Sequence, residues 1–223
     1  MKTCVIIPTF NEAKNIAEII KQLRAQNLDV LVIDDGSCDG THIIAEKHGA
    51  KVIRNTKNEG KGASLIKGFN HALSLDFHAV ITMDGDGQHL VEDIPYFIRL
   101  AQYSNSGIII GNRMHKPKSM PWHRFLTNKG MSWFISSITK QHIPDSQCGF
   151  RLIKREVLEK MDLKTRKYEI ESEVLIKGAR LGYKIEAVSI KTIYTGQKSQ
   201  INPLIDTLRF IRFAWVELWI SRR

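Results

Sequence analysis

The sequence predicts an α/β protein built on a mostly parallel β-sheet with helices on both faces. Short apolar runs of strand length recur through the first half of the chain. Segments with apolar residues at helical spacing separate these runs, and such alternation is typical of repeated βα units. Hydrophobic residues make up 43% of the 223 residues, which is enough to form one large core.

The βα units can be followed in order along the first half of the chain. Val5–Ile7 is a short apolar run that ends at the turn-forming segment Pro8–Glu12. In Ala13–Gln26, Ile16 and Ile20 are four residues apart, which places them on one face of a helix. The later strands and helices are expected at Val30–Ile33, Thr41–His48, Lys51–Arg54, Gly60–Ser74, Ala79–Met83, Ile94–Tyr103 and Ile108–Ile110.

The pattern changes after residue 112. Met114–Pro121 is basic and rich in turn formers, so a mobile loop is expected there. Trp122–Thr139 reads as an amphipathic helix and Asp145–Arg151 as a compact polar segment. Glu171–Leu181 is expected to be helical and Ile185–Tyr194 to be extended.

The C-terminal residues 201–223 form a second predicted unit, after a main domain over residues 1–200. Leu204, Leu208, Ile211 and Trp215 recur at helical spacing, and several arginines accompany them. We therefore expect an amphipathic basic helix. It either packs against the domain or a partner, or it lies at a membrane surface.

The net charge of +10 indicates an anionic partner, such as nucleotide phosphates, a lipid phosphate, an acidic membrane surface or nucleic acid. The three cysteines are far apart and show no metal-binding spacing, which favours a reducing, cytoplasmic setting. No apolar stretch approaches the roughly 20 residues that cross a bilayer, so peripheral attachment is the expected form of membrane contact.

Asp84-Gly85-Asp86 follows the predicted strand Ala79–Met83, so two carboxylates lie at the carboxyl end of a strand, where open α/β sheets bind ligands. With the side-chain oxygen of Gln88 they would suit Mg²⁺ or Mn²⁺ together with phosphate oxygens. A tight turn is the alternative interpretation. An EF-hand loop is excluded because its sixth position would be His89.

Two further polar segments follow other strands. Asp34 and Asp35 end the predicted strand Val30–Ile33, and a carboxylate there could accept hydrogen bonds from a base or ribose. Asn58–Gly62 contains two glycines that permit close backbone approach to a ligand, although it lacks the Walker spacing of an ATPase.

The order of these motifs resembles that of inverting family 2 glycosyltransferases. The matching segments are Ile6-Ile-Pro-Thr-Phe-Asn-Glu12, Asp34-Asp-Gly-Ser37, Asp84-Gly-Asp-Gly-Gln-His89 and Gly111-x-Arg113. Two more, Asp145-Ser-Gln-Cys-Gly-Phe-Arg151 and Tyr194-x-x-x-Lys198-Ser, are similar to those of dolichyl- or polyprenyl-phosphate sugar transferases. The resemblance implies the GT-A fold, a Rossmann-like, mostly parallel sheet flanked by helices.

The resemblance also implies roles for individual residues. The nucleotide would be held by Pro8, Phe10, Glu12, Ile33 and Asp35. Asp84, Asp86 and Gln88 would engage the divalent ion and the diphosphate, with Gly85 between them. Arg113 and Lys198 match positions that contact the phosphates of the donor or acceptor. The expected substrates are a UDP- or GDP-sugar and an acceptor that is a lipid phosphate.

The acceptor decides which residues are catalytic. A hydroxyl acceptor needs a carboxylate base, for which Glu171 and Glu173 are the candidates. A lipid phosphate is already anionic and instead needs cationic positioning by Arg113, Arg124 or Arg151. The basic composition favours the phosphate.

Two functions of other classes are less consistent with the sequence. A sugar nucleotidyltransferase would show a glycine-rich basic loop after the first strand, where this chain has Pro8–Glu12. A non-catalytic module that binds membranes or nucleic acid would use the positive charge but would leave both acid clusters unexplained, so no nucleic-acid partner is expected.

Overall fold

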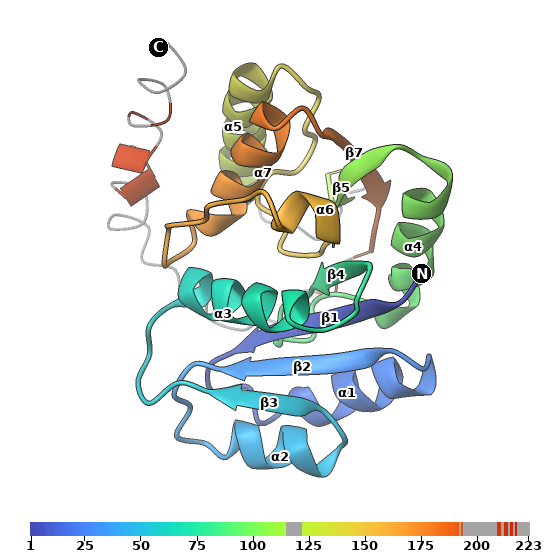
Figure 1. Ribbon diagram of the computed structural model, residues 1–223. Coiled ribbons are helices and arrows are strands. Elements are labelled where there is room, and N and C mark those ends of the chain that lie inside the picture. The colour runs from blue at the N-terminus through green and yellow to red at the C-terminus, as the bar shows by residue number, and fades with distance from the viewer. Residues whose placement is uncertain are drawn as a thin grey trace.

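The computed structural model describes residues 1–114, 122–191 and 193, together with 209–210, 212–213, 215 and 217, but not the side chains of residues 123 and 124. These residues form a seven-stranded sheet with helices on both faces (Figure 1). The strands are β1 Thr3–Thr9, β2 Asp29–Asp34, β3 Lys51–Arg54, β4 Ala79–Thr82, β5 Ser106–Asn112, β6 Arg151–Lys154 and β7 Lys184–Ser189. The helices are α1 Ile16–Ala25, α2 Thr41–Lys47, α3 Lys61–Leu73, the 3₁₀ turn η1 Val91–Asp93, α4 Ile94–Tyr103, α5 Trp122–Thr139, α6 Arg155–Leu158 and α7 Ile170–Arg180.

The strand order is β3-β2-β1-β4-β6-β5-β7, and every strand except β6 runs in the same direction. The carboxyl ends of β1, β2, β4 and β5 therefore share one edge of the sheet. Thr9 pairs with Asp34 in the register of β1 and β2, so these two strands end side by side. The predicted fold class is confirmed, and its topology brings the predicted acid clusters to a single edge.

Both faces of the central strands are buried, which explains why the strands read as continuous apolar runs. Val5 and Ile7 pack with α1 and α4 on one face, whereas Cys4 and Ile6 pack with α3 on the other. Figure 1 shows α1, α2 and α4 on one side of the sheet and α3, α5, α6 and α7 on the other.

The second half contains two elements that the sequence did not predict, β6 and the short helix α6. β6 was missed because its two apolar residues, Leu152 and Ile153, lie between Arg151 and Lys154, which is too short a run to predict a strand. The extended segment predicted at Ile185–Tyr194 overlaps β7, which begins one residue earlier and ends at Ser189. Of the predicted loop Met114–Pro121, all but its first residue lies outside the described residues.

The described C-terminal residues are helical and contact the domain. The ring of Phe210 packs edge-on against Phe134 of α5, with centroids 5.8 Å apart. Arg180 of α7 forms an ion pair with Glu217 and donates a second hydrogen bond, of 2.7 Å, to its carbonyl oxygen. The amphipathic helix over 201–223 as a whole stays a prediction. Within the described part of the chain, no helix is both long and apolar enough to span a bilayer.

Candidate active site

The acidic pair Asp84 and Asp86 lies at the carboxyl edge of the sheet, immediately after β4. Thr82, the last residue of β4, donates a 2.6 Å hydrogen bond from its hydroxyl to the carbonyl of Gly149, so the segment before β6 lies alongside. The backbone N–H of Gln88 donates to Asp86 Oδ1 at 3.0 Å. The loop thus folds back on itself and keeps both carboxylates at the sheet edge.

Lys61, the first residue of α3, joins Asp84 to a second acid. Its Nζ lies 2.6 Å from Asp84 Oδ1 and 2.6 Å from Glu171 Oε1. Burial opposes ionisation of Asp84, but the charge of Lys61 outweighs it and lowers the pKa of Asp84 to about 2. Burial also disfavours the ammonium, yet the two carboxylates raise the pKa of Lys61. Asp84 and Lys61 are therefore both charged at neutral pH.

Asp86 is electrostatically different from Asp84. No Lys, Arg or His side chain of the described residues forms an ion pair with it. Burial and the charge of Asp84 both raise the pKa of Asp86. Burial likewise raises the pKa of Glu12, and the charges of Asp86, Asp39 and Asp84 act in the same direction. Negative charge is thus only partly compensated at this position.

A divalent cation fits this pair in part. Two carboxylates on one loop, in a negative potential that is only partly compensated, are suitable hard ligands for Mg²⁺ or Mn²⁺. The described residues contain no group of three or more His, Cys, Asp or Glu side chains that could hold a metal. A cation here would therefore need donor oxygens from the substrate in addition to Asp84 and Asp86, and this is how Mg²⁺ is usually held beside phosphates.

His89 and Gly149 form the inner wall beside Asp84. The His89 ring stacks on Phe150 with centroids 5.1 Å apart, and its Nδ1 accepts from the Asp84 N–H at 3.3 Å. Burial lowers the pKa of His89 to about 4, so the ring is neutral at pH 7. A Cβ at Gly149 would lie 2.8 Å from Asp84 Oδ2 and 2.9 Å from Lys61 Nζ, so a larger residue would displace both groups.

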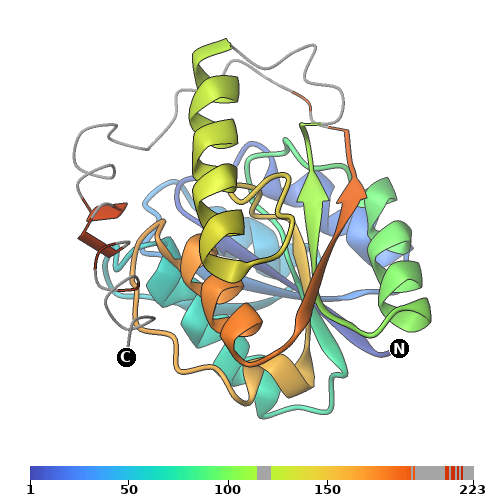
Figure 2. The ribbon, with the colours of Figure 1, turned by 90° about the horizontal axis from the view of Figure 1, so that it is seen from above.

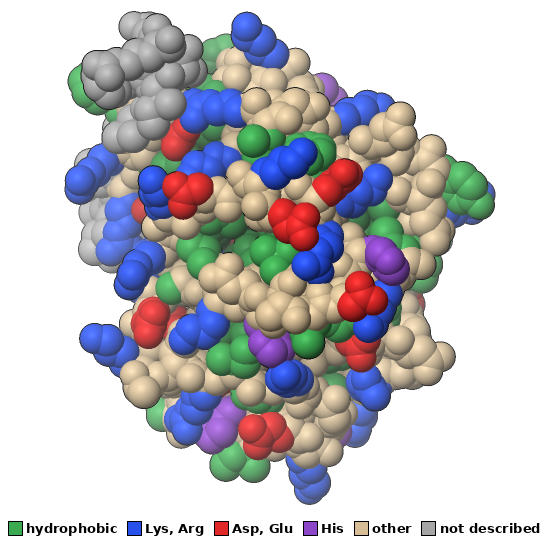
Figure 3. Space-filling view, viewed as in Figure 1, with side chains coloured by type: hydrophobic (Ala, Val, Ile, Leu, Met, Phe, Trp, Pro, Cys, Tyr) green, Lys and Arg blue, Asp and Glu red, His purple; other side chains and the backbone are tan. Residues whose placement is uncertain are grey.

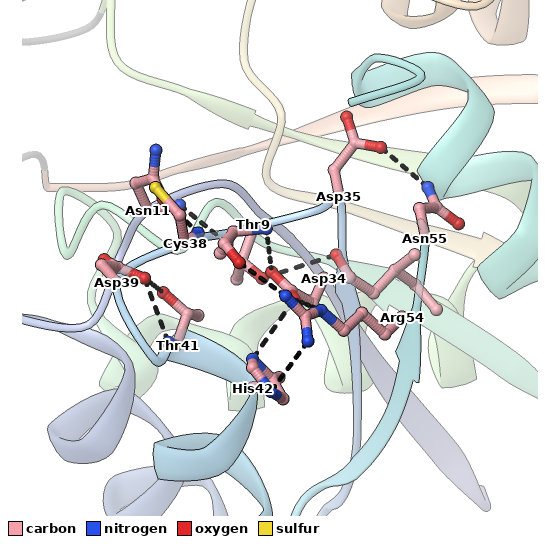
Figure 4. A network of polar contacts seen from close by, with 12 residues as sticks. Thr9, Asn11, Asp34, Asp35, Cys38, Asp39, Thr41, His42, Arg54 and Asn55 are labelled. Atoms are coloured by element: carbon pink, nitrogen blue, oxygen red, sulfur yellow. Dashed lines mark hydrogen bonds and ion pairs between the residues drawn. The ribbon is translucent and has the colours of Figure 1, made fainter. Parts of the chain in front are cut away.

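The acidic loop after β2 is held by a network of polar contacts (Figure 4). Asp34 is fully buried and forms an ion pair with Arg54, with Nε and Oδ2 3.1 Å apart. Asp39 Oδ1 accepts from the N–H of Thr41 at 3.0 Å and from its hydroxyl at 2.5 Å. The side chain of Asn11, which has a φ of 59°, accepts from the N–H of Cys38 at 3.0 Å. These contacts connect the loops after β1 and β2.

Asp35 contacts the loop that leads into α3. Its Oδ1 accepts from the Glu59 N–H at 2.9 Å and from the Asn55 side chain at 2.7 Å, and its Oδ2 accepts from the Gly60 N–H at 2.8 Å. Asp35 therefore fixes the backbone immediately before Lys61. Its contact with a base or ribose stays a prediction.

Arg113 follows β5 at the same edge and is held by Asp145, a fully buried residue of the segment before β6. Nε and Nη2 of Arg113 lie 2.8 Å and 2.9 Å from the two oxygens of Asp145, and the Arg113 N–H donates to Oδ2 at 3.1 Å. This bidentate contact fixes the plane of the guanidinium.

Arg151 has a different environment from Arg113. It is buried at the start of β6 and donates to the carbonyl oxygens of Cys148 and Ser146, both at 2.7 Å, and to that of Glu171. These contacts connect the segment before β6 to α7. They favour a positioning role for Arg151 over the direct phosphate contact suggested by the sequence.

Glu173 is also engaged by other groups. It accepts from the N–H of Lys164 at 2.9 Å, from the N–H and hydroxyl of Thr165 at 2.8 Å and 2.6 Å, and from Lys177 Nζ at 2.6 Å. Burial opposes ionisation, but these donors outweigh it and lower the pKa of Glu173. Glu173 holds the loop before α7, and the carbonyl of Arg166 in that loop accepts from the N–H of Ala63 in α3 at 3.1 Å.

The remaining candidates lie in three places. Pro8 and Ile33 are register partners on β1 and β2. Phe10 follows β1, and Gly85 lies close enough to β1 that a Cβ there would be 2.9 Å from Thr9 Cγ2. The Arg124 side chain, although α5 carries its backbone, and the whole of Lys198 lie outside the described residues.

Comparison with known proteins identifies the family. The domain described as Glycosyl transferase family 2 matches residues 4–162, a range that includes β1 to β6 and the acidic pair. The chain belongs to glycosyl transferase family 2. A related UDP-N-acetylglucosamine–dolichyl-phosphate N-acetylglucosaminyltransferase of Methanococcus voltae is 31% identical over 86% of this chain and 85% of the relative. A dolichol-phosphate mannosyltransferase of Pyrococcus furiosus is 36% identical over 80% of this chain, which spans 53% of that relative.

The fold of this family 2 glycosyltransferase is that of solved GT-A enzymes. A glucosyl-3-phosphoglycerate synthase from Mycobacterium tuberculosis, whose structure is a complex with Mn²⁺, UDP and phosphoglyceric acid, superimposes with a TM-score of 0.73. That match covers 97% of this chain and 77% of the other at 18% identity. The predicted family and GT-A fold are both confirmed.

The cysteines of this glycosyltransferase provide a simple test of which side chains the fold buries. Burial raises the pKa of Cys4 and of Cys148 to about 12, whereas Cys38 is exposed. Because only the thiolate reacts, iodoacetamide at pH 8 should alkylate Cys38 roughly a thousandfold faster than either buried cysteine. Mass spectrometry should find one adduct on the native protein and three after denaturation. A second adduct appearing on the native protein at the rate of the first would contradict the burial of Cys4 and Cys148.

Proposed function

We propose that this protein is a metal-dependent, inverting glycosyltransferase that moves a sugar from a nucleoside diphosphate to a polyprenyl or dolichyl phosphate. The names of the related enzymes from Methanococcus voltae and Pyrococcus furiosus support a lipid-phosphate acceptor. The bound UDP and Mn²⁺ named for the mycobacterial structure support a nucleotide donor and a divalent ion.

The choice of acceptor rests on a single observation, which is that both candidate general bases are already engaged by other groups. Glu171 forms an ion pair with Lys61, and Glu173 accepts hydrogen bonds from a loop and from Lys177. A general base must be free to take a proton from the acceptor. Neither carboxylate is in that state. A phosphate oxygen is already an anionic nucleophile at pH 7 and needs no base.

The residues of the chain then have distinct tasks. The loops after β1 and β2, which include Phe10 and Asp35, border the expected nucleotide position. Asp84 and Asp86, with Gln88, would hold Mg²⁺ or Mn²⁺, which when bound neutralises the leaving diphosphate. Arg113, held by Asp145, would orient a phosphate.

Inversion follows from attack in one displacement. The bond from the acceptor phosphate oxygen to the anomeric carbon forms as the bond to the donor diphosphate breaks on the opposite side of that carbon. Arg124 and Lys198 are the further cations proposed to attract the acceptor, and its lipid chain would place the protein at the cytoplasmic face of a membrane.

Whether a glutamate acts as the general base can be tested by substitution. Because neither glutamate is proposed to take a proton, Glu171→Gln and Glu173→Gln should each lower the rate of transfer less than about tenfold once the protein is folded. Thermal unfolding would show whether Glu173→Gln loosens the loop before α7. A loss of more than roughly a hundredfold in a folded variant would instead indicate a general base and a hydroxyl acceptor.

The proposed function is tested with purified protein. A thermal-shift screen of UDP- and GDP-sugars with Mn²⁺ should find the donor, because a ligand of the native state raises its apparent stability. Transfer from that donor to a polyprenyl phosphate, and not to the matching polyprenol, is the expected outcome. Transfer to the polyprenol alone would contradict it.

A further inference from the structure

We propose that the outward face of α5 is the surface through which this protein lies on an anionic lipid bilayer. The proposal rests on the proposed function in one respect, because a lipid acceptor would be presented from that bilayer. The evidence for the surface itself comes from the exposed side chains of α5, from the basic sequence next to it and from its position beside the sheet edge.

α5 is apolar on two opposite sides, whereas the sequence predicted an ordinary amphipathic helix. On the inward side, Ile135 is fully buried and Phe134 and Ile138 pack against the core. On the outward side, Trp122 is 74% exposed and Trp133 72% exposed. A helix that is apolar all round is usually buried on all sides. Here one of those sides faces solvent.

The outward apolar residues form one stripe along the helix. Leu126, which is 56% exposed, lies four residues after Trp122 and seven before Trp133, and these spacings place all three on the same face. Lys129 is exposed between them. Tryptophan side chains beside basic residues are typical of helices that lie at the interface of a membrane.

The sequence in and next to α5 is basic, as an anionic surface would require. From Ile94 to Pro144 the sequence contains no Asp or Glu, although it contains seven Lys or Arg residues. These are Arg99, Arg113, Lys116, Lys118, Arg124, Lys129 and Lys140. Arg99 belongs to α4 on the other side of the sheet and Arg113 is paired with Asp145, so the other five are the basic residues that lie in α5 or near it in the sequence. A second protein subunit would have no particular need for such a segment, whereas anionic lipid attracts it at about 1 kcal/mol per basic residue near the surface.

The position of α5 agrees with this orientation. Figure 2 shows that the N-terminal end of α5 extends past the tips of β5 and β7, on the side of the sheet where the strands end. The acidic pair and Arg113 lie at that same edge. A bilayer in contact with α5 would therefore lie on the side from which an acceptor lipid must reach the site.

The first experiment measures binding of the full chain to vesicles without donor or acceptor. The wild type should bind phosphatidylcholine vesicles that contain phosphatidylglycerol and should bind pure phosphatidylcholine vesicles more weakly. The Trp122→Ala/Trp133→Ala variant should lose at least about tenfold in partitioning, because two interfacial indoles are removed. The matched control is Tyr96→Ala/Tyr103→Ala on α4, which removes two exposed aromatic residues (58% and 83% exposed) and should bind as the wild type does.

The second experiment reports contact by α5 directly. The chain has four tryptophans, so Trp215→Phe/Trp219→Phe leaves only Trp122 and Trp133 to fluoresce. Their emission should shift to the blue and be quenched by brominated lipid. An absence of quenching on bound vesicles would overturn the proposal, and so would unchanged partitioning of Trp122→Ala/Trp133→Ala.

Two further measurements distinguish bilayer contact from donor binding and from self-association. Nucleotide binding by Trp122→Ala/Trp133→Ala should equal that of the wild type, so vesicle binding through α5 can be established even if no sugar transfer is found. If these substitutions abolish self-association in sedimentation but leave vesicle binding intact, the face binds a second copy of the chain and the proposal is wrong.

Discussion

Asp86→Asn is expected to lower sugar transfer by roughly a hundredfold to a thousandfold, because metal assistance supplies several kcal/mol and each 1.36 kcal/mol is a factor of ten. The asparagine oxygen can still accept from the Gln88 N–H that now binds Asp86 Oδ1. The change therefore removes a charge and leaves the shape of the loop.

The stability of Asp86→Asn should not fall with its activity. Burial and Asp84 raise the pKa of Asp86 in the folded protein, so its ionised form at neutral pH is less favourable folded than unfolded. Removing that charge should leave the melting temperature unchanged or slightly higher. A folded, inactive and equally stable protein is the signature of a residue kept for function.

Calorimetry of nucleoside diphosphate binding with and without Mn²⁺ measures the effect directly. The wild type should bind more tightly with Mn²⁺, and Asp86→Asn should lose that difference. Asp93→Asn is the matched control, since Asp93 is a buried carboxylate nearby that accepts from the Lys191 N–H at 3.2 Å. Unchanged affinity of Asp86→Asn in the presence of Mn²⁺ would falsify the metal assignment.

Lys61→Met is the second change with a large expected effect. It leaves Asp84 and Glu171 close together and mostly buried without the ammonium that now lies 2.6 Å from each. Removing one partner of a buried ion pair costs about 3 kcal/mol or more. In a domain of this size the melting temperature should fall by roughly 10 °C. Donor binding should weaken as well, because Asp84 loses the contact that holds its carboxylate.

Two companion variants make the Lys61 result specific. Lys61→Arg keeps a cation and should retain most of the stability. Adding Glu171→Gln to Lys61→Met removes one of the two unpaired carboxylates and should restore part of the lost stability, a non-additivity expected for residues in contact. Purely additive melting temperatures would show that the bridge does not stabilise the protein.

The acidic pair and the strand-end positions could be predicted from sequence because they depend on local patterns. Apolar runs ending in Asp35 and Asp84 place both residues at the carboxyl edge of any parallel sheet. That reasoning needs no knowledge of how distant segments meet.

What could not be predicted is which partner each charge finds. Lys61 contacts Glu171 across 110 positions of sequence, and Arg113 contacts Asp145 across 32. Contacts between residues so far apart produce no periodic pattern in the sequence. The glycine-rich loop Asn58–Gly62 was the only available signal for Lys61, and it was weak because it lacks a known phosphate-loop spacing.

Figure 3 shows why the net charge alone was also a limited guide. Lys and Arg side chains spread over the face seen there, with fewer Asp and Glu among them. The cation most closely tied to the acidic centre, Lys61, is by contrast mostly buried. The total charge therefore indicated an anionic partner without indicating the position of the site.

The contact of Asp35 with Glu59 and Gly60 has a consequence for attempts to change the donor. The residue expected to read the nucleoside also sets the backbone from which Lys61 reaches Asp84. A substitution at Asp35 meant to exchange one base for another would shift the phosphate end of the site at the same time. We therefore expect base preference and catalytic rate to be coupled in this enzyme, so that directed evolution of donor choice should require paired changes at Asp35 and in the loop 58–60.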